Sequence, residues 1–213
     1  PRAVTGYEVR PLHLSAREVD GYYRRVANGV LWPLLHSFPA LVRTHDADWR
    51  VYRGVNRRFA TQAAALVARG GACWVHDFQL TLVPQMVRAL RPDVRVGWFC
   101  HVPWPAPEIL ATLPDRDELL LGLLGADLLG FQTPRDARNF LAAAEEVAHQ
   151  RVDHARGVVL LGDREVRVAA FPIGIDVDAI QALASSREGR DLRTRMRERL
   201  GTGRLLLAVD RLD

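Results

Sequence analysis

Lysine is absent from this chain of 213 residues, so all 29 basic residues are arginines. Every permanently cationic side chain that these residues offer to a ligand is therefore a planar guanidinium, which can bind a phosphate through two parallel hydrogen bonds. The sequence also lacks a G-x-G-x-x-G fingerprint and a G-x-x-x-x-G-K-[ST] loop. These absences argue against a nucleoside triphosphatase and against a simple dinucleotide-dependent dehydrogenase.

Long apolar runs and cysteines are scarce as well. No apolar stretch reaches the roughly 18 residues that a membrane-spanning helix needs, and no signal-peptide pattern follows Pro1. We therefore expect a soluble, cytoplasmic protein with no membrane partner. The two cysteines, Cys73 and Cys100, lie in strand-like apolar stretches without metal-ligand spacing, which predicts buried free thiols.

The formal net charge is +4, but the arginines are spread along the chain and interleaved with 25 acidic residues. A nucleic-acid-binding surface would need clustered basic residues, commonly with aromatic residues between them. We therefore expect no nucleic-acid partner. The seven histidines lack the spacing of metal ligands, so we expect neither a metal ion nor another cofactor.

Short β-rich runs alternate with helical runs in the middle of the chain. Strand-like residues 72–76, 95–100 and 127–133 are each followed by a helical or proline-rich segment. Next comes either a hairpin turning at Gly162-Asp163 or a pair of late strands. This alternation predicts an α/β fold with a Rossmann-like, doubly wound and mostly parallel sheet. With 48% hydrophobic residues, the chain can bury a substantial core.

The first third of the chain is expected to be mainly helical. The pattern of residues 7–14 predicts a strand, and an S-x-x-E capping box at Ser15 and Glu18 then begins a helix. Residues 46–71 predict a long helix that is stopped by its two final glycines.

Polar residues follow each predicted strand. His76 and Asp77 end the first strand, His101 follows the second, and Gln132-Thr133 follows the third. In open α/β sheets, ligands bind beyond the carboxyl ends of the strands, so these residues are predicted to form a site at one edge. Asp77 is equally well interpreted as a helix N-cap. A histidine such as His76 is more often a partly buried residue whose hydrogen bonds are satisfied within the fold.

His101, Trp32, Tyr23 and Arg211 are candidates for ligand binding, and the first three also have a plainer interpretation. His101 precedes a rigid V-P-W-P loop that could aim its ring at a ligand, or it could be a solvent-exposed turn residue. Trp32 could form the wall of a sugar pocket or belong to the core, and the Tyr23 hydroxyl could reach a phosphate or a sugar oxygen. Arg211 follows the last predicted strand, where its guanidinium could bind phosphate.

Six motifs follow one another along residues 8–213: "YYRRVANGVLWPLLH", "WVHDFQLTLVPQMVR", "RVGWFCHVPWPAPEILATLP", "LLGADLLGFQTPRDARNFL", "FPIGID" and "VDRLD". Together and in this order, they resemble the motifs of the trehalose-6-phosphate synthases, a family of retaining glycosyltransferases. Phe78-Gln79 stands where the family usually has Tyr-His, and Trp98 and Trp104 replace phenylalanines. These changes keep aromatic bulk, so they bear on fine specificity more than on membership.

The resemblance implies a GT-B fold, in which two Rossmann-like domains face each other across a cleft. It implies transfer of glucose from UDP- or GDP-glucose to glucose 6-phosphate, with retention and without a metal ion. At the matching positions, Tyr23, Trp32 and Asp77 would contact glucose 6-phosphate. His101 would contact the donor glucose, and Arg211 the donor diphosphate. Asp77 and His101 are the expected catalytic residues.

The resemblance also predicts the domain organisation. Residues 1–203 are expected to form the N-terminal, acceptor-binding domain without its first strand and Gly-rich loop. Residues 204–213 are expected to be the first strand of the C-terminal nucleotide-sugar domain. We therefore expect a fragment of a longer protein that is inactive by itself. The sequence leaves open whether the protein is a homo-oligomer, which base the donor carries, and whether a phosphatase domain is fused to it.

Two other functions fit the same motifs. One is a related transferase with another acceptor, such as a glucosylglycerol-phosphate synthase or a pseudo-glycosyltransferase that couples cyclitols. The motifs "NGVLWP" and "DRLD" favour the trehalose branch over these. The other is a non-catalytic domain that binds a phosphosugar and regulates a partner. Such a domain would bind glucose 6-phosphate without binding nucleotide sugar and without turnover.

Overall fold

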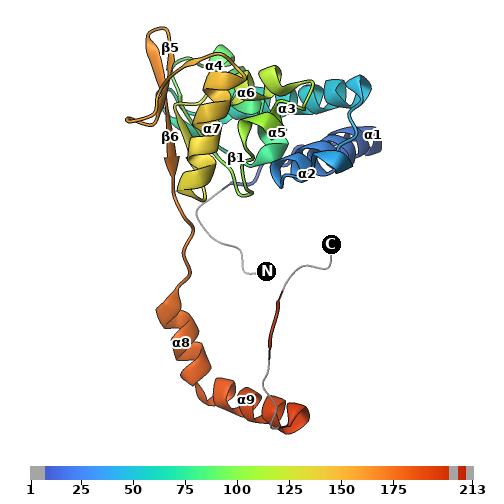
Figure 1. The fold of residues 1–213 in the computed structure, drawn as a ribbon, viewed down its shortest axis with the longest axis vertical. Coiled ribbons are helices and arrows are strands. Elements are labelled where there is room, and N and C mark those ends of the chain that lie inside the picture. The colour runs from blue at the N-terminus through green and yellow to red at the C-terminus, as the bar shows by residue number, and fades with distance from the viewer. Residues whose placement is uncertain (1–7, 202–205, 210–213) are drawn as a thin grey trace. The chain divides into compact units, whose positions relative to one another are not determined.

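The computed structural model describes residues 8–201 and 206–209. The chain divides into two compact units, Pro1–Pro172 and Ile173–Asp213, and each is considered by itself (Figure 1). The first unit holds a six-stranded sheet with its helices. Within the described ranges, no helix combines the length and the apolar character that a membrane crossing would need.

The sheet has the strand order β1-β2-β3-β6-β5-β4. The first four strands in this order pair in parallel, and the last two continue the sheet in antiparallel orientation. The predicted α/β fold with a mostly parallel sheet is therefore confirmed. The strands are β1 (Ala72–His76), β2 (Arg95–Phe99), β3 (Leu128–Phe131), β4 (Arg151–Asp153), β5 (Val158–Leu161) and β6 (Arg164–Ala170).

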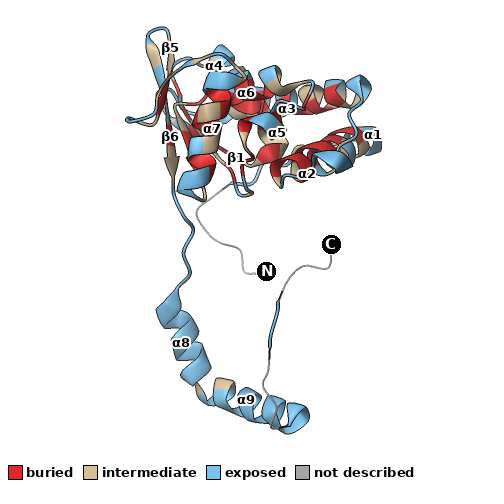
Figure 2. Cartoon of the chain, viewed as in Figure 1, coloured by how far each residue is buried: buried red, intermediate tan, exposed pale blue. Residues whose placement is uncertain are grey.

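Alternation along the strands gives the sheet a covered face and an open face. Val75, Trp98 and Phe131 lie on the covered face and are almost completely buried. Helices α4 (Val83–Leu90) and α7 (Pro134–Glu146) pack against strands of the sheet, and Figure 2 shows the buried residues gathered where helices and sheet meet. On the open face, Trp74 is 68% exposed.

An aromatic cluster anchors the segment that follows β2. The Trp104 ring lies edge-on to Trp98 at a centroid distance of 6.3 Å, and edge-on to Phe131 and Phe140 at 5.7 and 5.3 Å. Each such contact contributes about 0.5–1.5 kcal/mol beyond the burial of area. Because Trp104 belongs to the proline-rich loop, the cluster fixes this loop to the core. Short α5 (Pro107–Leu110) and α6 (Arg116–Leu123) follow the loop.

The predicted capping box is confirmed. The Ser15 N–H donates to Glu18 Oε2 at 2.8 Å, and the Glu18 N–H donates to Ser15 Oγ at 3.3 Å. The box begins α1 (Ala16–Glu18), which continues into a π-helix, η1 (Val19–Leu31), and then into α2 (Trp32–Leu35).

The strand predicted over residues 7–14 is wrong for its described part, 8–14, which belongs to no strand. Pro11 lacks an N–H, so this segment can donate only an interrupted row of hydrogen bonds to a neighbouring strand. The long helix is present as α3 (Asp46–Leu66), which ends before the two glycines. A 3₁₀ turn, η2 (Pro39–Leu41), precedes it.

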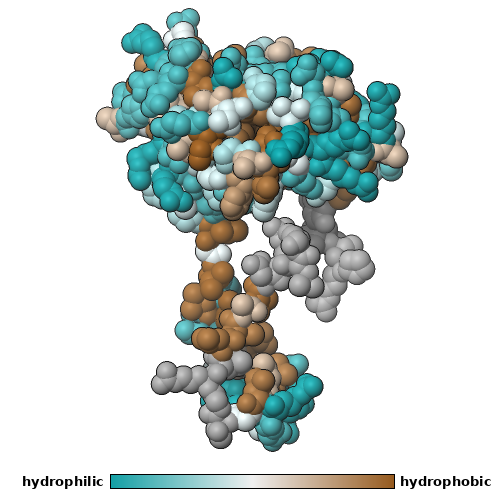
Figure 3. Space-filling view, turned by 45° about the vertical axis from the view of Figure 1, so that its right-hand side comes forward, coloured by the Kyte–Doolittle hydropathy of each residue, from teal (hydrophilic) through white to brown (hydrophobic). Residues whose placement is uncertain are grey.

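The described part of the second unit consists of two amphipathic helices, α8 (Val177–Ser185) and α9 (Arg187–Leu200). Its apolar side chains are visible in Figure 3 and include Ile180, Leu183 and Leu192, each at least half exposed. The domain boundary predicted after residue 203 adjoins residues outside the described ranges and stays a prediction. Of the strand predicted over 204–213, only 206–209 is described, and it carries no strand assignment.

Candidate active site at the ends of β1 and β2

Asp77 directly follows β1 in a backbone conformation that side chains rarely adopt. Its φ is +70° and its ψ is 174°, a region that is almost exclusive to glycine and costs about 1–3 kcal/mol for other residues. Hydrogen bonds to the end of β2 hold this conformation, and the Asp77 carbonyl also accepts from the Leu80 N–H at 3.2 Å. The Asp77 N–H donates to the Phe99 carbonyl at 2.8 Å, and its carbonyl accepts from Trp98 Nε1 at 3.0 Å. The carboxylate Oδ1 accepts from the His101 N–H at 3.1 Å.

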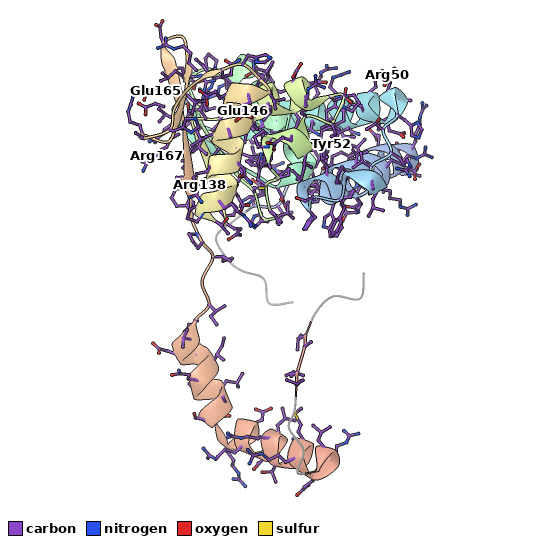
Figure 4. The ribbon with its side chains drawn as sticks, in the orientation of Figure 1. Arg50, Tyr52, Arg138, Glu146, Glu165 and Arg167 are labelled. Atoms are coloured by element: carbon purple, nitrogen blue, oxygen red, sulfur yellow. The ribbon has the colours of Figure 1, made fainter. Side chains whose placement is uncertain are left out.

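Two side chains of helix α3 hold the turn after Asp77 by hydrogen bonds. The Tyr52 hydroxyl, inside the molecule in Figure 4, donates to the Phe78 carbonyl at 2.8 Å and accepts from the Thr81 N–H at 3.1 Å. Buried Asn56 donates from Nδ2 to the Gln79 carbonyl at 3.1 Å. These bonds satisfy the buried backbone groups of η3 (Phe78–Leu80) and hold the turn in place.

The ring of His101 lies against two other aromatic side chains at the ends of β1 and β2. Its Nε2 is 3.0 Å from Nδ1 of His76, and the ring centroids are 5.2 Å apart. The Phe99 ring lies 4.9 Å from His101, and the Trp74 ring lies 4.6 Å from His76. The strand register explains this row, because His76 is directly opposite Phe99 in the parallel pair.

The electrostatic surroundings keep His76 neutral. Partial loss of water lowers the pKa of its ring below the ordinary 6.5, and nearby His101 lowers that pKa further, whereas Asp77 acts in the opposite direction. Burial raises the pKa of the Cys100 thiol, which points to the Val102 carbonyl at 3.2 Å. Cys73 is buried too, so the predicted buried free thiols are confirmed. Neither thiol is placed to act as a nucleophile.

The proline-rich loop after His101 is bonded to the N-terminus of α7. Buried Asp136 accepts from the Trp104 N–H at 3.1 Å and from the Thr133 hydroxyl at 2.6 Å. Asn139 donates from Nδ2 to the Trp104 carbonyl at 2.9 Å. His101 therefore stands on a loop that is held at both ends, by Asp77 and by α7.

Tyr23 and Trp32 lie on helices that pack against the elements following the ends of β1 and β2. Tyr23 is 46% exposed on η1, which packs against η3, and α2, which begins at Trp32, packs against α5. The Trp32 ring stacks on His36 at 4.1 Å. Among the described residues, neither side chain forms a hydrogen bond with Asp77 or His101. Arg211 lies outside the described residues.

The sequence is compatible with His76 as a site residue or as a partly buried structural histidine, and it does not predict the bond between His76 and His101. The structure exposes its ring and joins it to His101. The signal that could have found it is the strand pairing, since neighbouring parallel strands that end together bring His76 and His101 to one edge. Within the described ranges, no group of three or more histidine, cysteine or acidic residues is arranged to hold a metal ion.

This arrangement can recognise a ligand that is rich in hydroxyl groups. The second carboxylate oxygen of Asp77 has no hydrogen-bond partner among the described residues, and the His101 ring is exposed. Together they offer an anionic acceptor and an imidazole nitrogen on a rigid frame, next to an exposed aromatic surface.

The family model described as glycosyltransferase family 20 matches residues 1–213. The chain is 44% identical over 216 residues to the trehalose-6-phosphate synthase of Mycobacterium ulcerans, covering 97% of this chain and 43% of that protein. It is 41% identical to that of Mycobacterium tuberculosis (strain ATCC 25618 / H37Rv), again covering 97% of this chain and 43% of the relative. The chain thus spans less than half the length of these curated relatives.

Solved structures of related proteins are also similar to this chain. One is an alpha,alpha-trehalose-phosphate synthase (UDP-forming) from Burkholderia xenovorans in complex with glucose-6-phosphate, with a TM-score of 0.75 and 33% identity over 84% of this chain and 41% of that one. Another is the E. coli protein bound with UDP-2-fluoro glucose, with a TM-score of 0.79 and 32% identity over 87% of this chain and 41% of that one.

Proposed function

Because the chain belongs to glycosyltransferase family 20, we propose that it is the acceptor-binding part of a trehalose-6-phosphate synthase. The complete protein transfers glucose from a nucleotide-glucose to glucose 6-phosphate and retains the anomeric configuration. The observation that carries this function is the hydrogen bond from the His101 N–H to Asp77, because it joins the proposed donor and acceptor residues at one sheet edge.

The proposed substrates are glucose 6-phosphate and UDP-glucose. A related structure from Burkholderia xenovorans holds glucose-6-phosphate, and the related E. coli structure holds UDP-2-fluoro glucose. Solved relatives from Burkholderia vietnamiensis and Burkholderia xenovorans are named as UDP-forming, which favours UDP over GDP for this protein. The predicted cytoplasmic location and the oligomeric state stay open.

In the proposed mechanism, Asp77 and His101 position the two sugars against each other. Oδ1 of Asp77 is engaged by the His101 N–H, so the other oxygen accepts a hydrogen bond from an acceptor hydroxyl. His101 binds a hydroxyl of the donor glucose. Tyr23 and Trp32 contact glucose 6-phosphate from the side of η1 and α2.

Charge stabilisation at the leaving group is the second requirement. Transfer from a nucleotide sugar develops negative charge on the departing diphosphate, and preorganised cations stabilise that charge. We assign this task to Arg211. Since the acceptor hydroxyl and the departing diphosphate are held on one face of the donor sugar, transfer with retention follows from orientation.

Calorimetry on this chain tests the acceptor role. We expect glucose 6-phosphate to bind and UDP-glucose to bind much more weakly, without turnover, because the nucleotide half of the family's fold is not in these residues. Asp77→Asn keeps the shape of the side chain and removes its charge, so it should weaken glucose 6-phosphate binding about ten- to a hundredfold. Asp163→Asn makes the same change in the β5–β6 turn and should leave binding unchanged. No binding of glucose 6-phosphate by the folded chain would contradict the proposal.

A non-catalytic phosphosugar-binding protein is the second candidate, because the described residues hold only one side of a two-substrate site. Assays of the complete protein decide between the two functions. Formation of trehalose 6-phosphate establishes the transferase, whereas tight acceptor binding without any product supports the binding module. Product with a different acceptor would indicate the related transferases instead.

A further inference from the structure

The roles proposed above use His101 but leave its partner His76 without a function. The two rings are joined by a hydrogen bond of 3.0 Å between Nδ1 of His76 and Nε2 of His101, with 23° between the ring planes. Both side chains are exposed at the sheet edge, where water could otherwise satisfy each ring separately. A direct bond between them therefore constrains His101 beyond what folding of the core requires.

We propose that His76 is a positioning residue, which holds His101 through Nε2 so that only Nδ1 of His101 can face a ligand. The identity of that ligand as the donor sugar rests on the proposed function, whereas the bond between the rings does not. His101 is thereby held at two points. Asp77 fixes its backbone N–H at 3.1 Å, and His76 fixes the far end of its ring.

The chemistry of a bond between two imidazoles couples their protons. An N–H···N bond contains one hydrogen, so one of the two nitrogens must be protonated and the other must offer a lone pair. If His76 donates, neutral His101 carries its hydrogen on Nδ1 and presents a donor. If His76 accepts, neutral His101 presents a lone pair at Nδ1. In either case the state of His76 decides what His101 offers to a sugar hydroxyl.

The packing around His76 suits this role. Its ring is supported by Trp74 at 4.6 Å, and the backbone of β1 places it directly opposite Phe99, whose ring supports His101 at 4.9 Å. Partial loss of water and nearby His101 also lower the pKa of His76, against the opposing charge of Asp77, which favours the neutral ring that can serve as either donor or acceptor. A cationic His76 would have no lone pair at Nδ1 and would repel a protonated His101.

Two substitutions separate hydrogen bonding from packing. His76→Phe keeps a flat ring beside Trp74 and His101 but removes both nitrogens. His76→Asn loses the ring, yet its amide group can reach the position of Nδ1 and can present either an N–H or an oxygen. His154→Phe is the matched control, because it removes another exposed histidine that forms a side-chain hydrogen bond elsewhere, to Glu145 at 2.8 Å.

The measurement is the ¹⁵N NMR spectrum of the imidazole rings of this chain, recorded against pH. In the unsubstituted chain we expect His101 to occupy a single tautomer. His76→Phe should change the tautomer of His101, His76→Asn should restore it, and His154→Phe should leave it unaltered. A His101 spectrum that is identical in His76→Phe and in the unsubstituted chain would overturn the proposal. Equal disturbance by His76→Phe and His76→Asn would do the same, since it would point to packing alone.

Kinetics of the complete enzyme give a second reading. His76→Phe should lower kcat/KM for the nucleotide sugar about three- to tenfold, the worth of one hydrogen bond, while the KM for glucose 6-phosphate stays the same. His76→Asn should recover most of the loss. An effect on the KM for glucose 6-phosphate alone would contradict the proposal. Failure of the chain to bind any sugar phosphate would contradict the proposed function instead, and the NMR result would still decide whether His76 positions His101.

Discussion

Two hydrogen-bonded pairs in the first unit each contain an exposed histidine, but the surrounding structure holds them differently. His76 and His101 stand at the ends of neighbouring parallel strands, and further hydrogen bonds fix the backbone around them. His154 and Glu145 lie 2.8 Å apart beside β4, with 51% and 49% of their side chains exposed. Among the described residues, the bond between them is the only side-chain hydrogen bond that either of these two residues forms. The difference teaches that a site depends on how many independent constraints meet at a residue, more than on which residue stands there.

The largest loss of stability should come from removing the buried hydrogen bonds that hold the turn after Asp77. Asn56 donates to the carbonyls of Tyr52 and Gln79 and accepts from the Leu82 N–H. Asn56→Ala leaves these buried groups without partners and should lower the free energy of unfolding by about 3 kcal/mol. Urea denaturation measures this. Gln62→Ala on the same helix, where the side chain forms only a 3.5 Å bond, should change it by less than about 0.5 kcal/mol. Similar losses in both variants would show that the turn does not depend on Asn56.

A second, smaller effect should reveal the backbone strain at Asp77. Glycine adopts the observed dihedral angles freely and alanine does not, so Asp77→Gly should be more stable than Asp77→Ala by about 1–2 kcal/mol. Both variants remove the carboxylate, so both should lose affinity for glucose 6-phosphate. Denaturation and calorimetry on the same samples measure the two quantities. Equal stability of the two variants would mean that the strain is absent.

The pH dependence of stability should report the lowered pKa of His76. Since the folded chain lowers the pKa of His76 below 6.5, the unfolded chain binds more protons as the pH falls through that value. Stability contributed by neutral His76 is therefore present above about pH 6.5 and is lost below it. The decline between pH 7.5 and 5.5 should be smaller in His76→Phe than in the unsubstituted chain, and an equal decline in both would contradict the prediction. Glu18, whose pKa is lowered to about 2 mainly by the Ser15 N–H and Arg58, loses its contribution only below this window.

The smallest effect is expected at the exposed pair itself. Glu145→Gln removes the charge opposite His154, and exposed pairs of this kind contribute less than about 0.5 kcal/mol because water and salt screen them. The free energy of unfolding at pH 7.5 should stay within error of the unsubstituted chain. A loss comparable with that of Asn56→Ala would erase the distinction between the two regions.

Much of the fold could be predicted from the sequence, because local signals agree with the tertiary structure. Alternating strand and helix patterns gave the parallel strands, and the Ser15–Glu18 box gave the start of the first helix. The antiparallel end of the sheet was only partly anticipated. Its β4 strand has three residues, too few for a periodic pattern to indicate a strand. The segment 8–14 shows the opposite error, since an alternating pattern does not supply a neighbouring strand.

The candidate site was predictable to a similar extent. The rule that ligands bind beyond parallel strand ends led to Asp77 and His101, which the structure places in direct contact. The bond between His76 and His101 could not be read from either residue alone, since it depends on the register of two strands and on the ring directions. The roles of Tyr23, Trp32 and Arg211 stay predictions.

The hydrogen bond between Asp77 and the backbone of His101 couples the positions of these two residues. If Asp77 selects the acceptor and His101 the donor, a change that retunes either choice moves the other through a link of 3.1 Å. Substitutions at the two positions should then be epistatic, with combined effects that differ from the sum of the single ones. Under that condition, a new combination of donor and acceptor sugars would require coordinated replacement at both strand ends, because a single substitution would alter both choices.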